Sequence, residues 1–244
     1  MKIGIIGAMK QEISCLFPEI KKCKINKIQN HIIYTGRIQG IQTILLLSGI
    51  GKVSASMVTT LILINYQPDI IINIGSAGSL NPLLKINDII IPNKICYHDV
   101  DVCTFKYSIG QIPHYPIVFF PNFRLLAIAK ICLKALYYPF KEGLMLTGDS
   151  FVSNKNQFTS ILKNFPEAMA IEMESTAIAQ VCYKFNTPFL IIRAISDLSD
   201  NNSNTYFKKN IKNISNCLAQ IIINIFKKIY FLLKKNVRIC YKKN

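Results

Sequence analysis

Residues 70–78 read IIINIGSAG, in which an apolar run at 70–74 is followed by a glycine-rich turn. An apolar run of this length is typical of a strand buried on both faces of a sheet. Six other runs look like strands: 3–7, 43–48, 89–92, 143–147, 168–172 and 189–195. Helical periodicity marks segments between them: 52–65, 124–136, 155–165 and 173–185. Strands that alternate with helices predict an α/β fold.

The remaining segments complete the predicted domain. Residues 30–35 and 38–47, joined around Gly36 and Arg37, resemble a hairpin, which makes the central sheet mixed. We therefore expect a single three-layer α/β domain over residues 1–233, with helices on both sides of the sheet. A last long helix is expected from about Thr205, and one face of it carries Ile211, Ile214, Leu218, Ile221, Ile222 and Ile225. Residues 234–244 form a basic tail that we expect to be frayed.

The composition narrows the class of protein. Eight scattered cysteines form no C-x-x-C pair and there are three histidines, so we expect no metal site, no disulfide framework and a cytoplasmic location. The apolar stretches are interrupted well before the ~20 residues that a membrane span needs, and we expect no membrane association. The net charge is +16, but ten basic residues follow Phe207 without one acid, and only four of the 29 basic residues are arginine. Nucleic acid is therefore not the expected partner, apart from nonspecific contact by the tail.

Unusual residues stand where the predicted strands end. Each of six strand ends carries glycine or an acid: 7–9, 48–51, 75–78, 148–151, 172–174 and 196–197. In α/β folds, ligands bind at the carboxyl ends of the strands. We therefore expect a cleft lined by backbone amides and carboxylates.

Several common functional motifs are incomplete or absent. Gly51 and Lys52 resemble the end of a P-loop, but Leu46 stands where its first glycine is required. Neither G-x-G-x-x-G after the first strand nor G-x-S-x-G occurs. His98 with two nearby aspartates could imitate a metal cluster, but neighbours on an extended segment point to opposite faces.

Nine ordered motifs carry a family resemblance. They are MKIGIIGAM followed by Glu12, YTGR, SGIGKV, DIIINIGSAGSL, YHDVDV, GQIP, TGDSFV, AIEMESTAIA and RAISDLSD. Together they resemble the 5′-methylthioadenosine/S-adenosylhomocysteine nucleosidases, from Met1 to about Phe226. The resemblance implies a nucleoside phosphorylase-like fold, a homodimer, no cofactor, and hydrolysis of the N-ribosyl bond of 5′-thio-substituted adenosines. It leaves the preference among methylthioadenosine, S-adenosylhomocysteine and 5′-deoxyadenosine open.

The resemblance also implies roles for single residues. Glu12 matches the general base that activates water, and Asp197 matches the acid that protonates purine N7. The residues that match the ribose and water site are Ser76, Met173, Glu174 and Arg193. Those that match the adenine site are Ala77, Gly78, Phe151 and Val152. The apolar 5′-thio pocket is matched by Met9, Ile50, Val102 and Phe207, with Phe105 and Pro113 contributed from the partner subunit.

Each acid has a simpler interpretation beside the catalytic one. Glu12 lies in the first turn of a predicted helix, where a carboxylate is favoured by the dipole. Asp197 could cap the turn after Ser196, and Glu172 could be only a supporting acid. Phenylalanines such as Phe151 are ordinarily core residues. The chemistry nevertheless favours the catalytic interpretation, because an N7 acid neutralises the leaving base and a carboxylate near the sugar can accept a proton from water.

Phosphorolysis is the nearest rival reaction. Phosphate sites use arginine, and related phosphorylases carry Gly-Asp-Pro after the first strand and an arginine before the Gly-Ser turn. Here the first turn is Gly7-Ala8-Met9 and the second position is Asn73. We therefore expect water as the nucleophile. A non-catalytic nucleoside-binding relative, or a basic accessory protein, stays open as a different class.

Overall fold

The computed structural model describes residues 1–199, 203–237 and 239. One nine-stranded sheet runs through the described chain in the order β2-β3-β4-β1-β5-β8-β7-β6-β9. Its strands are β1 (Lys2–Gly7), β2 (Lys21–Ile28), β3 (His31–Ile38), β4 (Ile41–Leu47), β5 (Ile70–Ser79), β6 (Ile89–Tyr97), β7 (Phe140–Thr147), β8 (Ala168–Glu172) and β9 (Phe189–Asp197). The sheet is mixed, as expected, since β1 pairs parallel with β4 and β5 while β3 pairs antiparallel with β2 and β4.

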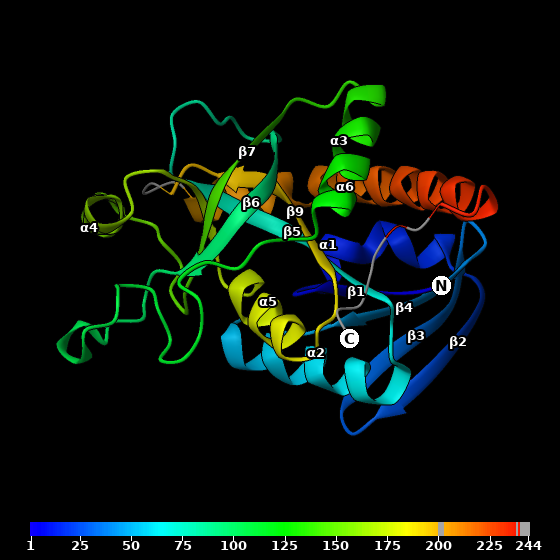
Figure 1. Ribbon diagram of the computed structural model, residues 1–244. Helices are drawn as coiled ribbons and strands as arrows, with labels where there is room; N and C mark the ends of the chain where they lie inside the picture. The colour runs from blue at the N-terminus through cyan, green and yellow to red at the C-terminus, as the bar shows by residue number, and fades with distance from the viewer. Residues whose placement is uncertain (200–202, 238, 240–244) are drawn as a thin grey trace.

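Helices cover both faces of this sheet (Figure 1). They are α1 (Lys10–Ile13), α2 (Lys52–Tyr66), α3 (Phe123–Ala135), α4 (Lys155–Asn164), α5 (Ser175–Lys184) and α6 (Ser203–Lys234), with short 3-10 helices η1 (Ser14–Glu19) and η2 (Cys103–Phe105). On one face α6 packs against α1 and α3, and on the other α2 packs against α5. Each face has its own apolar cluster. The predicted three-layer α/β domain is confirmed.

The second half of the sheet closes on itself. β5 pairs with β8 and also, in parallel, with β9, so that β5, β8, β7, β6 and β9 form a closed ring of strands. All nine residues of β9 are buried, which explains the apolar run at residues 189–192 with which it begins. This closure brings the ends of β5, β8 and β9 to one place.

The hairpin is present, but its turn was predicted at the wrong residues. β3 continues through Gly36 to Ile38, and the chain reverses at Gln39 and Gly40, which have φ of 48° and 84°. Gly36 is needed for a different reason: a Cβ there would lie 2.5 Å from a methyl carbon of Ile20. The glycine allows close packing inside a strand.

One strand was missed, and others are longer than predicted. β2 (KKCKINKI) is an edge strand with almost every residue exposed, and lysines on such an edge hinder pairing with other chains. It therefore lacks the apolar pattern on which strand prediction depends. β5 continues to Ser79 and β6 to Tyr97, although their predicted runs ended at residues 74 and 92.

Helix α6 begins two residues before the predicted start. It is long and apolar enough, with a mean hydropathy of 1.3, to span a membrane by length and composition alone. Its apolar face packs against the sheet and helices α1 and α3. Five of the six predicted positions on this face are buried, and Ile211 is only partly buried. A helix buried in a core passes the same composition test. In the predicted tail, Ile239 is buried in the core, and residues 238 and 240–244 lie outside the described residues.

Candidate active site

A cavity of about 570 Å³ opens at the carboxyl ends of the strands. All six strand ends singled out in the sequence contribute to its wall. The sequence-predicted residues that line it are Met9, Glu12, Ile50, Ser76, Ala77, Gly78, Phe151, Val152, Met173, Glu174, Asp197 and Phe207. The structure thus brings together twelve residues that are separated by almost 200 positions in the chain.

Glu12 is held by three hydrogen bonds from two directions. Its Oε1 accepts from the backbone N–H and from the hydroxyl of Ser76, both at 2.8 Å. Its Oε2 accepts from the backbone N–H of Met9 at 3.0 Å and so caps the short helix α1. A carboxylate offers about four acceptor positions, so about one remains on Oε2 for a further donor. Glu12 thus has a role at the start of the helix, but this role occupies only part of its side chain.

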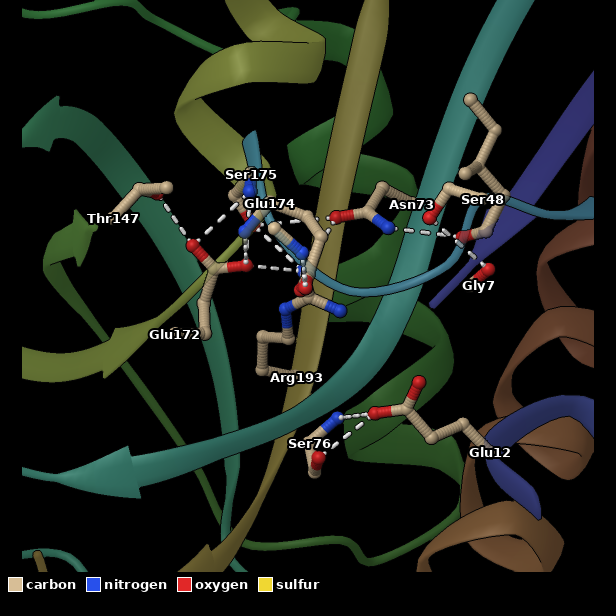
Figure 2. Close-up of polar contacts among 12 residues, drawn as sticks. Gly7, Glu12, Ser48, Asn73, Ser76, Thr147, Glu172, Glu174, Ser175 and Arg193 are labelled. Carbon is tan, nitrogen blue, oxygen red and sulfur yellow. Dashed lines mark hydrogen bonds and ion pairs between the residues drawn. The ribbon is translucent and has the colours of Figure 1, made fainter. Parts of the chain in front are cut away.

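Glu172 is engaged on both oxygens. It accepts hydrogen bonds from the Thr147 hydroxyl, from the backbone N–H of Glu174 and Ser175, and from the Arg193 guanidinium (Figure 2). These donors fill the positions that a carboxylate offers. Glu172 therefore holds the turn between β8 and α5 in place, as the supporting-acid interpretation expects.

Glu174, two residues later, is different. It is only 5% exposed, yet its Oε1 accepts a single hydrogen bond, from the backbone N–H of Gly51 at 3.0 Å. Its Oε2 lies 3.6 Å from Nη2 of Arg193, which is too long for a hydrogen bond. Burial, and then the charge of Glu172, raise the pKa of Glu174, while Arg193 opposes them. Glu174 therefore keeps acceptor positions for a ligand.

Arg193 lies behind these carboxylates and does not line the cavity. It is completely buried, and its Nη2 donates to Asn73 Oδ1 at 2.7 Å and to the Ser175 hydroxyl at 3.0 Å as well as to Glu172. Burial alone would lower the pKa of Arg193, but the surrounding glutamates raise it above its ordinary value. The guanidinium is a fixed positive charge under an acidic site (Figure 2).

Gly75 lets Arg193 and Glu12 approach the same point of β5. A Cβ at this position would lie 2.1 Å from Nη1 of Arg193 and 2.9 Å from Oε1 of Glu12. Neither group could stay in place beside a side chain there. The glycine of the sequence motif is thus required by close packing of two charged groups.

Asp197 ends β9 and is buried. Its Oδ2 accepts from the Ser196 hydroxyl at 2.7 Å, and its Oδ1 accepts from the backbone N–H of Ser199 at 3.0 Å. A Cβ on Gly78 would lie 3.0 Å from Oδ1, so Asp197 meets β5 at Gly78 whereas Glu12 meets it at Ser76. Two strand residues separate these points by about 7 Å. Two acids therefore face one cavity with space between them for a small molecule.

Four predicted site residues do not line the cavity of the single chain: Val102, Phe105, Pro113 and Arg193. Phe105 is 73% exposed. Phe151 also is not a core residue, since it is 49% exposed and lies against the cavity. Glu172, considered as a supporting acid, also lines the cavity, and the lining residues that had no predicted role are Ala8, Ser150, Ser153, Ile171, Ser196, Ser199 and Asn204. Most of them stand inside or beside the quoted motifs, but Asn204 had no sequence signal.

The charge of the cavity wall is one-sided. Four carboxylates line it, those of Glu12, Glu172, Glu174 and Asp197, and no lysine, arginine or histidine of the described chain does. Asn73, where a phosphorylase arginine was considered, is buried and binds Arg193 and the backbone carbonyl of Ile6. A multiply charged anion would meet only negative side chains here.

Comparison with known proteins agrees with this geometry. The family model of the phosphorylase superfamily matches residues 2–227. The chain is 52% identical to the 5′-methylthioadenosine/S-adenosylhomocysteine nucleosidase of Buchnera aphidicola subsp. Schizaphis graminum, over 94% of this chain and 97% of the relative. Among solved structures, the nucleosidase of Neisseria meningitidis in complex with methylthio-immucillin-A has a TM-score of 0.91 at 37% identity, covering 93% of this chain and 99% of that one.

A neighbour with another name shows how widely the fold is used. Futalosine hydrolase of Helicobacter pylori matches with a TM-score of 0.89 at 30% identity, over 93% of this chain and 98% of that one. The fold alone thus does not fix the nucleoside, whereas the relatives of Buchnera aphidicola and Neisseria meningitidis, which are 52% and 37% identical, are both named as nucleosidases. This chain belongs to the phosphorylase superfamily and, within it, to the 5′-methylthioadenosine/S-adenosylhomocysteine nucleosidase family.

Proposed function

We propose that the protein hydrolyses the N-ribosyl bond of 5′-methylthioadenosine and S-adenosylhomocysteine, and also of 5′-deoxyadenosine, to release adenine and the 5′-substituted ribose. The observation that carries this proposal is the cavity wall, which holds four carboxylates and, among the described residues, no cationic side chain. Phosphate as a nucleophile needs cationic groups, but water needs only a base.

Glu12 supplies the base. Three of its acceptor positions are filled by Ser76 and Met9, which fix the carboxylate, and the remaining position accepts a hydrogen bond from the attacking water. As the bond to the base breaks, positive charge grows on the sugar. The carboxylate of Glu12 takes the proton of the water and offsets this charge.

Asp197 supplies the acid. It protonates N7 of the purine, so that the base leaves as a neutral molecule rather than as an anion. Ser196 and Ser199 hold its two oxygens in place. Because Asp197 and Glu12 meet β5 about 7 Å apart, the bond that breaks can lie between them.

The other contacts orient the substrate. The free acceptor positions of Glu174 take the two ribose hydroxyls, beside Met173 and Ser76, while Arg193 fixes the glutamates from behind. Ala77, Gly78 and the backbone of Val152 surround the adenine, on which Phe151 stacks. Met9, Ile50 and Phe207 provide the apolar surface for the 5′ substituent.

We further propose that the working unit is a homodimer. Ile50 is 55% exposed at the cavity, and α2 continues this apolar surface with Val53 and Met57, exposed by 72% and 55%. Exposed apolar patches next to a site are typical of subunit interfaces. In such a dimer the segment that carries Phe105 and Pro113 would close the 5′ pocket of the other subunit. Val102, expected in the pocket of its own chain but absent from that wall, lies on the same segment and would move with it to the other subunit's pocket. The proposed enzyme is cytoplasmic and serves methionine salvage and removal of the methyl-cycle product, with no further partner.

Adenine release tests the proposal. Purified protein is incubated with 5′-methylthioadenosine, with and without saturating phosphate, and adenine is measured by chromatography. Equal rates in both buffers are expected. A rate that depends on phosphate would indicate phosphorolysis, and a protein that binds the nucleoside without releasing adenine would be a non-catalytic relative.

A further inference from the structure

Ser199 carries a buried hydroxyl that nothing in the described structure satisfies. The residue is 2% exposed, it lines the cavity, and its Oγ has no hydrogen-bond partner among the described residues. Burying a hydroxyl without a partner is unfavourable. Such a group at the wall of a ligand cavity is explained if the ligand supplies the partner.

The backbone holds this hydroxyl in a fixed position. Ser199 has a φ of 54°, in the left-handed region that residues other than glycine seldom adopt. Its backbone N–H donates to Oδ1 of Asp197, which secures the conformation. Unfavourable backbone conformations of this kind are concentrated at functional sites.

The hydroxyl lies beside the proposed acid. A Cβ on Gly78 would lie 2.5 Å from Oγ of Ser199 and 3.0 Å from Oδ1 of Asp197, so both oxygens face the same point of β5. The glycine leaves room for both. A base that meets Asp197 therefore also meets Ser199.

We propose that Ser199 is a specificity-determining residue that hydrogen-bonds the substituent on C6 of the purine. This rests on the proposed function, in which Asp197 meets N7. In a purine, N7 is bonded to C8 and C5. C8 carries only hydrogen. C5 is bonded to C6, and C6 carries the amino group of adenine. Only the C6 substituent can form a hydrogen bond with the serine. A hydroxyl accepts from a 6-amino group and can also donate to a 6-oxo group.

Two substrates that differ only at C6 test the proposal. Ser199→Ala and Ser199→Gly are compared with the wild type on 5′-methylthioadenosine and on its analogue with hydrogen at C6. Loss of the contact is expected to lower kcat/KM for the 6-amino substrate by about 3- to 10-fold and to leave the 6-hydrogen substrate within about twofold. Glycine adopts the positive φ without strain, so agreement of the two variants assigns the effect to the hydroxyl.

Equal losses on both substrates would overturn the proposal, because Ser199 would then act only through Asp197 or the backbone. No loss on either substrate would overturn it as well. A wild-type protein that releases no base would instead contradict the proposed function. In that case the affinities of the wild type and both variants for adenine and for unsubstituted purine, measured by calorimetry, test the role of Ser199. The wild type should prefer adenine over purine more strongly than either variant does. An equal preference in all three proteins would overturn the contact.

Discussion

Glu172 and Glu174 stand two residues apart at the end of β8, and both are buried, yet their surroundings differ. Glu172 accepts hydrogen bonds on both oxygens from Thr147, Arg193 and the backbone of the turn. Glu174 accepts one, from Gly51. Burial alone does not distinguish a supporting acid from a ligand-binding one. The number of acceptor positions that the protein leaves unfilled does.

Glu12 extends the same comparison. It resembles Glu172 in being firmly held and Glu174 in keeping an unfilled position. On this basis Glu12 and Glu174 are expected to act on substrate, and Glu172 on the stability of the site. The three carboxylates can be tested separately, since the same change from glutamate to glutamine should have different consequences at each.

Glu12→Gln should have the largest effect on the reaction. A glutamine cannot take a proton from water, so we expect kcat to fall by about 10²- to 10⁴-fold. Steady-state adenine release measures this, and the thermal midpoint of the variant shows that it is folded. A rate close to that of the wild type would show that another group activates the water.

Glu172→Gln should affect stability first. It removes one partner of a completely buried ion pair with Arg193, a change that costs about 3–5 kcal/mol. For a chain of this size we expect the Tm to fall by about 6–20 °C. Differential scanning calorimetry provides the measurement.

The matched control is Glu167→Gln, which removes an exposed ion pair with Lys94. Because exposed pairs contribute about 0–1 kcal/mol, its Tm should change by less than about 4 °C. Equal changes in the two variants would refute the structural role assigned to Glu172.

Glu174→Gln should weaken substrate binding, with a smaller effect than the other two changes. Hydrogen bonds to a charged group contribute about 1.5–3 kcal/mol, so we expect kcat/KM to fall by about 10- to 100-fold. Ribose hydroxyls favour the ionised carboxylate, whose pKa is raised in the empty site. The KM of the wild type should therefore fall as pH rises through this raised pKa, and the KM of the variant should not. A pH dependence that survives in the variant would assign it to another group.

The same shift predicts how stability depends on pH. Because the pKa of Glu174 is raised in the folded state, folding favours its protonated form. The stability that this provides is complete below the ordinary pKa of glutamate and is lost as pH rises toward the raised value. Glu174→Gln should thus gain Tm over the wild type across this window, by about 2–4 °C or more. A difference in Tm between variant and wild type that stays the same at all pH values would contradict the raised pKa.

The sequence was sufficient for the fold class because buried strands carry short apolar runs, such as residues 189–192 of β9, that leave little ambiguity. The sequence was not sufficient to interpret residues whose role is to allow packing between segments that are distant in the chain. Gly36 was interpreted as a turn, but it makes room for Ile20, and β2 escaped notice because its lysines are exposed at a sheet edge.

The site shows the same limit. The motifs contain nearly all the residues that line the cavity, because the strand ends carry them. They do not show which acid is already satisfied, since the partners of Glu172 come from two other strands, β7 and β9, and from the turn before α5. Likewise Val102, in the same run of motifs, lies away from the cavity of its own chain. Which acceptor positions stay unfilled is decided by the folded structure, because the donors come from distant parts of the chain.

The most direct test of hydrolysis is to follow the oxygen atom of the attacking water into the product. Reaction of 5′-methylthioadenosine in ¹⁸O-labelled water with saturating phosphate, followed by mass spectrometry, identifies the nucleophile. The account predicts adenine and a free 5-methylthioribose that carries one ¹⁸O at C1, when the sugar is analysed before that oxygen exchanges with solvent. Formation of the sugar 1-phosphate without label would contradict it.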